Sequence, residues 1–135
     1  MTTEPPKPPK TFLILLTSRP HDAQNYIHRV LLAILGMAKE YEKPPPGTLK
    51  IVLIDDGIYA YMKKWNAYAY KHSDWRMDLV AEWFPHFCEV YEVYALDESM
   101  KERGLTLDSL FNGVKICSLD DIAEWCTTQD YVIAF

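Results

Sequence analysis

One short apolar run, from Leu49 to Ile54, constrains the fold of this chain more than any other stretch. All but one of its residues are apolar and several are β-branched, which is typical of a parallel strand that is buried on both faces. Asp55, Asp56 and Gly57 follow directly, and residues of these types favour turns. Parallel strands need long return connections, and ligands gather at their carboxyl ends. The sequence therefore predicts a parallel sheet with the Asp55-Asp56-Gly57 turn at its binding edge.

Four further apolar runs have the length of strands and lie far enough apart for crossover connections. With the central run, the predicted strands are residues 12–17, 49–54, 90–96, 114–117 and 131–135. Apolar residues recur every three or four positions from Tyr26 to Tyr41, which predicts a helix, and further helices are predicted near residues 74–84, 97–103 and 119–126. Pro85 is expected to end or kink the second of these helices. We therefore expect an α/β fold: a single-domain three-layer open sheet of five mainly parallel strands, with helices on both faces.

Two of these helices carry end signals. Gly104 follows residues 97–103, and glycine is the usual residue where a helix ends in a left-handed conformation. Ser118 precedes the last helix, and Asp121 lies three positions later, where its side chain can return a hydrogen bond. The sequence thus predicts a helix end at Gly104 and a capped helix start at Ser118.

The chain has the size of one domain with a short tail. Its 135 residues are 49% hydrophobic, which suits a single sizeable core. Residues 1–10 contain four prolines, so we expect a flexible Pro-rich tail followed by one α/β domain over residues 11–135. The first apolar run, residues 12–16, is too short to span a membrane, and no cleavage site follows it. No membrane partner is therefore expected.

Charge and cysteine usage narrow the expected partners further. A formal net charge of −5 and a pI near 5.3 argue against nucleic acid as a partner. Cys88, Cys117 and Cys126 form neither a disulfide framework nor a CxxC metal pair, so reduced thiols in a cytoplasmic protein and no metal site are expected. The chain lacks the glycine-rich motifs of nucleotide-binding proteins, so no cofactor is expected.

Residues 59–75 combine aromatic with basic side chains. The aromatic members are Tyr59, Tyr61, Trp65, Tyr68, Tyr70 and Trp75. Such a composition can bind single-stranded nucleic acid, but the negative net charge favours a place in a subunit interface or a core. We therefore expect a homo-oligomer with Tyr or Trp residues of this stretch at an interface.

An ordered set of short motifs runs through the chain. They are the strand at 12–17, the long helix, Asp56-Gly57-Ile58-Tyr59, residues 93–96, Arg103-Gly104-Leu105, and residues 130–135. In this order they resemble the DsrE/DsrF/TusD-like sulfur-relay family. The resemblance implies a small cytoplasmic α/β protein that assembles into trimers or hexamers. Some members of the family carry sulfur as a cysteine persulfide, which implies sulfur donor and acceptor proteins as partners.

The resemblance also marks a difference at one position. In the members that carry persulfide, a cysteine lies at the end of the third strand, eight residues before the glycine of the Arg-Gly motif. In this chain that position is Leu96. Related subunits without the cysteine occur in the same assemblies, so the resemblance implies fold and assembly more directly than sulfur transfer.

Cys117 is the candidate for a relocated nucleophile. It lies at the predicted carboxyl end of a strand and directly before a helix, where the helix dipole favours a thiolate. A packing role competes with this interpretation, because Cys117 precedes the Ser118 cap and lies five residues before Ile122, the spacing of a hydrophobic staple. Asp120 and Asp121 would also oppose a thiolate. Cys88, two residues from His86, is a more distant candidate, and Cys126 is expected to pack as a small apolar residue.

Two loops supply candidate binding residues. Arg19 and His21 follow the first strand, and they could bind an anion or tune a thiol at the same edge as Asp55, Asp56 and Gly57. Leu96 belongs to this edge as the counterpart of the family's cysteine. Ordinary capping and turn roles compete with binding in both loops.

Three functions follow from these residues. The first is a persulfide carrier or relay subunit of sulfur metabolism, with Cys117 as the catalytic residue, which would make the chain a sulfurtransferase. The second is a non-catalytic structural or binding subunit of a similar assembly, in which Leu96 replaces the nucleophile. The third, less favoured, is an enzyme or a small-ligand site that uses Asp55 and Asp56.

Overall fold

A parallel sheet of five strands forms the centre of the protein, as the apolar runs predict. The structure is a computed structural model that describes residues 10–18, 49–63 and 77–135. The strands are β1 Phe12–Leu16, β2 Leu49–Leu53, β3 Glu92–Leu96, β4 Lys115–Cys117 and β5 Tyr131–Ala134. Their order is β4-β3-β2-β1-β5, and each of the four pairings is parallel. The predicted α/β fold is thereby confirmed.

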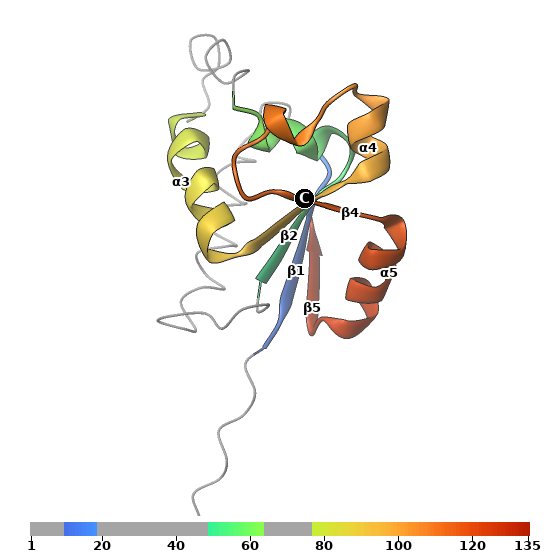
Figure 1. Cartoon of the computed structure of the whole chain (residues 1–135). Coiled ribbons are helices and arrows are strands. Elements are labelled where there is room, and N and C mark those ends of the chain that lie inside the picture. Colours follow the sequence, from blue (N-terminus) through green and yellow to red (C-terminus); the bar gives the residue numbers. More distant parts are fainter. Residues whose placement is uncertain (1–9, 19–48, 64–76) are drawn as a thin grey trace, which may run out of the picture.

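Helical segments connect the strands and cover the sheet. They are η1 Asp55–Tyr61, α3 Met77–Val90, α4 Asp97–Glu102, η2 Leu107–Ser109 and α5 Leu119–Thr128, where η marks a 3-10 helix. Figure 1 shows α3 and α5 on opposite sides of the sheet. The helix predicted from Tyr26 to Tyr41 lies outside the described residues. No helix in the described part of the chain is long and apolar enough to cross a membrane.

Both predicted helix-end signals are present. After α4, Gly104 adopts a φ of 63°, its N–H donates to the Lys101 carbonyl at 3.1 Å, and the Leu105 N–H donates to the Met100 carbonyl at 3.0 Å. This is the Schellman arrangement, in which a left-handed glycine satisfies the last carbonyls of a helix. At the start of α5, the Asp121 N–H donates to Ser118 Oγ at 3.1 Å, and the Ser118 N–H donates to Asp121 Oδ2 at 2.9 Å. The capping box is therefore complete.

Of the two outcomes predicted for Pro85, an end or a kink of its helix, the end does not occur. Helix α3 continues through Pro85 to Val90, and β3 consequently begins at Glu92 instead of at residue 90. A proline inside a helix costs about 3 kcal/mol, because it removes a hydrogen bond and crowds the preceding turn. Phe84 and Phe87, on either side of it, are 0% and 1% exposed, and burying each contributes about 1.5–3 kcal/mol. The packing of these two rings offsets the cost of the proline.

The two faces of the sheet bury separate apolar clusters. The larger cluster includes Ile14, Ile51 and Ala95 and also contains residues of η1, α3 and α4. The smaller cluster consists of Leu13, Val52, Leu96, Cys117 and Ile122, the last of which belongs to α5. Neighbouring residues of one strand, such as Ala95 and Leu96, thus enter different clusters, as the alternation of strand side chains requires. Strands β1 and β2 are buried on both faces, which explains their continuous apolar sequence.

The aromatic stretch that follows β2 divides between the core and the residues outside the description. Tyr61 is 0% exposed and stacks on Phe84, with ring centroids 4.7 Å apart, so it belongs to the core. Tyr59 is half-buried. The other four aromatic residues predicted for an interface, Trp65, Tyr68, Tyr70 and Trp75, lie outside the described residues.

Gly57 allows the start of η1 to pass directly against the end of β1. A Cβ atom at this position would lie 1.8 Å from the Leu16 carbonyl oxygen. The same carbonyl accepts a hydrogen bond from the Ile54 N–H at 2.9 Å. The chain therefore turns so tightly after β2 that only a residue without a side chain fits.

We predict that Gly57→Ala lowers the free energy of unfolding by about 3 kcal/mol or more, because backbone must move to admit the methyl group. Gly104→Ala serves as the matched control, since a Cβ there meets nothing within 4 Å and only the positive φ opposes it. That change should cost about 1–2 kcal/mol. Urea unfolding of both variants measures the difference. Equal stability losses would contradict the close approach at Gly57.

Candidate functional site

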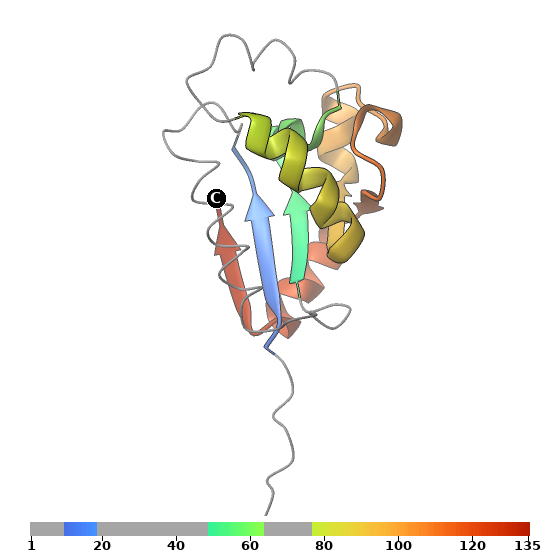
Figure 2. The ribbon, with the colours of Figure 1, turned by 90° about the vertical axis from the view of Figure 1, so that its left-hand side faces the viewer.

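The carboxyl ends of β1, β2, β3 and β4 meet along one edge of the sheet, which is where a parallel sheet places its ligands. Figure 2 shows β1 and β2 pointing toward the same end of the molecule. Asp55, Asp56 and Gly57 follow β2 at this edge, and Leu96 and Cys117 are the last residues of β3 and β4. The edge therefore collects most of the site residues that the sequence predicts within the described part of the chain.

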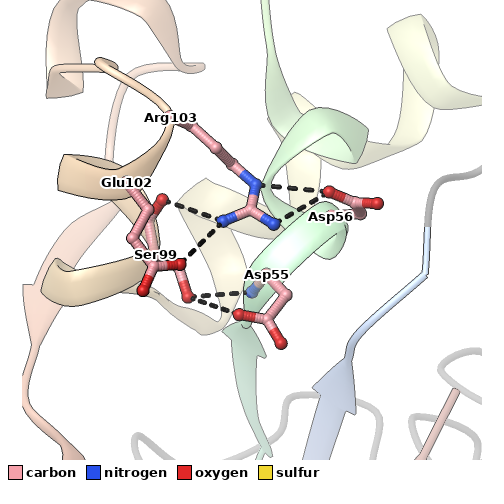
Figure 3. Close-up of polar contacts among 5 residues, drawn as sticks. All are labelled: Asp55, Asp56, Ser99, Glu102 and Arg103. Atoms are coloured by element: carbon pink, nitrogen blue, oxygen red, sulfur yellow. Dashed lines mark hydrogen bonds and ion pairs between the residues drawn. The ribbon is translucent and has the colours of Figure 1, made fainter.

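An ion pair between Asp56 and Arg103 joins η1 to the end of α4 (Figure 3). Asp56 Oδ1 accepts from Arg103 Nη2 at 2.9 Å and from Nε at 3.3 Å. The Arg103 Nη1 also donates to the Ser99 carbonyl at 3.2 Å and lies 3.6 Å from a Glu102 carboxylate oxygen. The Arg103 side chain is only 17% exposed, so this contact is partly shielded from water. Arg103 thus fixes the position of the loop that follows β2.

A second contact joins the same two elements through Asp55 and Ser99. The Asp55 N–H donates to Ser99 Oγ at 2.9 Å, and that hydroxyl donates to Asp55 Oδ1 at 3.2 Å (Figure 3). Asp55 has a φ of 50°, a conformation that Asp tolerates better than most residues. Ser99 is 1% exposed, so its hydroxyl is satisfied within the protein. Two hydrogen bonds therefore hold Asp55 in an otherwise unfavourable backbone geometry.

These contacts give Asp55 and Asp56 structural roles at the edge. Each carboxylate has one oxygen bonded to α4 or to the residue after it. Within the described ranges, no group of three His, Cys, Asp or Glu side chains is arranged to hold a metal ion. Gly57 has the third structural role, as the point of close approach to Leu16. The turn interpretation of this segment accounts for its geometry.

Leu96 and Cys117 are direct neighbours in the sheet. They are paired residues of β3 and β4 in the parallel register, and both side chains enter the smaller apolar cluster. Leu96 is 4% exposed and Cys117 is 3% exposed. The thiol therefore lies one strand away from Leu96, on the same face of the sheet.

The surroundings of Cys117 oppose its ionisation. Burial first, and then the Asp121 carboxylate, raise the pKa of the Cys117 thiol to about 12. Almost none of it is thiolate at neutral pH, and the thiolate is the nucleophilic form. The direction is opposite to the one that the helix start alone would favour. A helix terminus contributes about 0.3–1 kcal/mol, less than one pKa unit, so burial dominates.

The other two cysteines lie away from this edge. Cys88 is half-buried near the end of α3, and burial, then the Glu89 carboxylate, raise the pKa of its thiol to about 12. His86, its proposed companion, is exposed and lies within 4.0 Å of a Glu89 carboxylate oxygen. Cys126 is exposed on α5, so the prediction that it packs as a small apolar residue is wrong. All three cysteines are free thiols.

The sequence interpretation missed Ser99 and Arg103 as parts of this edge. The two residues lie four positions apart, so they fall on the same side of the helical turn that follows β3. That spacing, directly after a strand end, was the available signal. Arg19 and His21, the other candidate binding residues, lie outside the described residues.

The last predicted motif, residues 130–135, forms hydrogen bonds with the residues that flank β1 at both ends. The Thr11 N–H donates to Asp130 Oδ2 at 2.8 Å, and the Asp130 N–H donates to Thr11 Oγ1 at 3.0 Å. At the other end, the Thr17 N–H and hydroxyl both donate to the Phe135 carbonyl at 2.7 Å. Hydrogen bonds from Thr11 lower the pKa of the Asp130 carboxyl below its usual value. The motif residues thus bind β5 to the strand beside it.

Comparisons with known proteins agree with this architecture. A family model described as the DsrE/DsrF-like family matches residues 10–135. The crystal structure of the YchN protein from E. coli is similar to the chain with a TM-score of 0.72 at 17% identity, covering 93% of this chain and 99% of that one. The structure of MTH1491, titled a protein of unknown function, from Methanobacterium thermoautotrophicum gives a TM-score of 0.64 at 12% identity, covering 93% and 100%. No curated protein sequence matches significantly.

We predict a coupling free energy of about 1–2 kcal/mol between Asp56 and Arg103, because two N–H donors share one carboxylate oxygen in a partly shielded place. A double-mutant cycle of Asp56→Asn and Arg103→Met, followed by urea unfolding, measures it. The Asp97–Lys101 pair is the control, since it lies one helical turn apart with side chains 42% and 76% exposed. Its coupling should be about 0.3–0.5 kcal/mol. Equal couplings would contradict a special role for Arg103.

Proposed function

Because this chain belongs to the DsrE/DsrF-like family, we propose that it serves a sulfur-relay assembly as a structural or binding subunit that does not itself carry sulfur. Two observations support the proposal. The family is of a sulfur-relay type, and the carboxyl edge has its hydrogen bonds to Asp55 and Asp56 but no accessible thiol. In this role the chain would supply the family's fold and contact surfaces, while another protein carries the persulfide.

The observation that supports this proposal is Leu96. A persulfide forms when a thiolate attacks the sulfane sulfur of a donor persulfide, whose own thiol then leaves. Leu96 has no such group and packs with Cys117 and Val52 in an apolar cluster. The neighbouring thiol is buried and holds its proton. Neither residue therefore offers the donor a nucleophile.

A carrier role for Cys117 is the second candidate. It is supported by the register, since Cys117 pairs with Leu96 and ends its strand at the same edge of the sheet. For Cys117 to accept sulfur, α5 would have to move far enough to expose the thiol and admit water around it. The complete capping box at Ser118 and the packing of Ile122 resist that movement.

The proposed setting is a cytoplasmic homo-oligomer. Three free thiols suit a reducing compartment. Trimers or hexamers are the assemblies that the family resemblance implies, and sulfur donor and acceptor proteins would be its partners. Tyr59 is half-buried in the single chain, and such an interface would bury it further.

The test is incubation of the whole chain with excess polysulfide, followed by mass spectrometry of the intact protein and of its cysteine peptides. We expect no added sulfur on Cys117 in the folded protein, so the unaltered chain and Cys117→Ser should gain the same number of sulfur atoms. Sulfur on Cys117 that is lost in Cys117→Ser, and retained in the control Cys126→Ser, would establish the carrier role instead. Sedimentation of the same samples should show a trimer or a hexamer, and a monomer would contradict the proposed assembly.

A further inference from the structure

A cavity of about 240 Å³ lies between the end of η1 and η2, apart from the cysteines. Met62, Lys63, Asp108 and Ser109 line it. Both elements come after strands at the carboxyl side of the sheet, where ligands of parallel sheets bind. The cavity is smaller than those of roughly 300 Å³ and more that hold drug-sized molecules. Its size therefore suits a small metabolite.

The wall of this cavity is held by backbone pairing. The Lys63 N–H donates to the Ser109 carbonyl at 3.0 Å, and the Phe111 N–H donates to the Tyr61 carbonyl at 2.9 Å. Between them, Met62 and Leu110 form an antiparallel bridge. Tyr61 and Leu110 are both 0% exposed, so this short ladder rests directly on the core. The cavity wall is therefore formed before any ligand arrives.

Two side chains of opposite charge line the cavity. Lys63 supplies an ammonium group and Asp108 a carboxylate, and both residues are exposed. Neither forms an ion pair with another residue in the described ranges, whereas Lys50, Lys101 and Arg103 each do. A ligand that engages Lys63 and Asp108 would thus break no existing pair. Ser109 adds a polar residue and Met62 an apolar one to the lining.

We propose that this cavity binds a small zwitterion, a free α-amino acid with an apolar or thioether side chain. The carboxylate of the amino acid pairs with Lys63, its ammonium pairs with Asp108, and its side chain lies against Met62. Opposite charges at one cavity select a ligand that carries both charges over one that carries either alone. None of the three cysteines lines the cavity, so this binding is independent of sulfur transfer.

Calorimetric titration of the whole chain with L-methionine tests the proposal. N-acetyl-L-methionine lacks the ammonium, and L-methionine amide lacks the carboxylate, so each blocked compound should bind about tenfold more weakly. Lys63→Met and Asp108→Asn should each weaken the binding of L-methionine by about tenfold. Lys115→Met and Asp120→Asn make the same charge changes at exposed positions outside the cavity and should leave binding unchanged.

Several results would overturn the zwitterion site. One is the absence of saturable binding of L-methionine at millimolar concentrations in a chain that circular dichroism shows to be folded. Another is binding of either blocked compound as tight as that of L-methionine, which would show that the cavity does not recognise the charge that this compound lacks. Binding that survives in both Lys63→Met and Asp108→Asn would place the ligand elsewhere. The persulfide experiment stands apart, since its outcome changes none of these readings.

Discussion

The tight turn at Gly57 is the constraint on which the carboxyl edge depends. The Leu16 carbonyl approaches so closely that no Cβ fits, and this approach sets where η1 leaves the sheet. Asp55 and Asp56 are then presented to α4, where Ser99 and Arg103 bind them. A larger residue at position 57 would displace η1, and both contacts depend on its position. The sheet therefore fixes the position of the loop that follows β2.

The motifs that carry the resemblance to the family form hydrogen bonds between elements of this chain. The Asp-Gly motif and the Arg-Gly motif lie 47 residues apart in sequence and meet in the ion pair of Asp56 and Arg103. Asp130 and Phe135 of the terminal motif accept hydrogen bonds from Thr11 and Thr17, which flank β1. Such contacts preserve a fold whether or not a nucleophile is present. The chain can therefore belong to the DsrE/DsrF-like family with Leu96 at the position where the resemblance places the cysteine of persulfide-carrying members.

The sequence predicted what depends on local pattern. Apolar runs located the five strands, and Gly104 and Ser118 located two helix ends, because these signals act within a few residues. The bonds from Ser99 and Arg103 were not predicted, since periodicity carries no information about which side chains meet across two loops. The continuation of α3 through Pro85 was not predicted, because the burial of Phe84 and Phe87 is a tertiary effect. For Cys117, the position before a helix favoured a thiolate and the staple spacing favoured packing, and the structure agrees with packing, since burial and the Asp121 carboxylate raise the pKa of the thiol.

The central claim is that burial keeps positions 96 and 117 of this edge from offering a thiolate, and polysulfide treatment of the unaltered chain and of Leu96→Cys tests it most directly. The variant should remain folded, because a smaller apolar residue enters the same cluster at a cost of about 1–3 kcal/mol. After incubation with polysulfide, peptide mass spectrometry should find no added sulfur on Cys117 of the unaltered chain and none at position 96 of the folded variant, while the exposed Cys126 serves as the positive control. Sulfur on Cys117 of the folded chain, or at position 96 of the folded variant, in an amount equal to that on Cys126 would contradict the account.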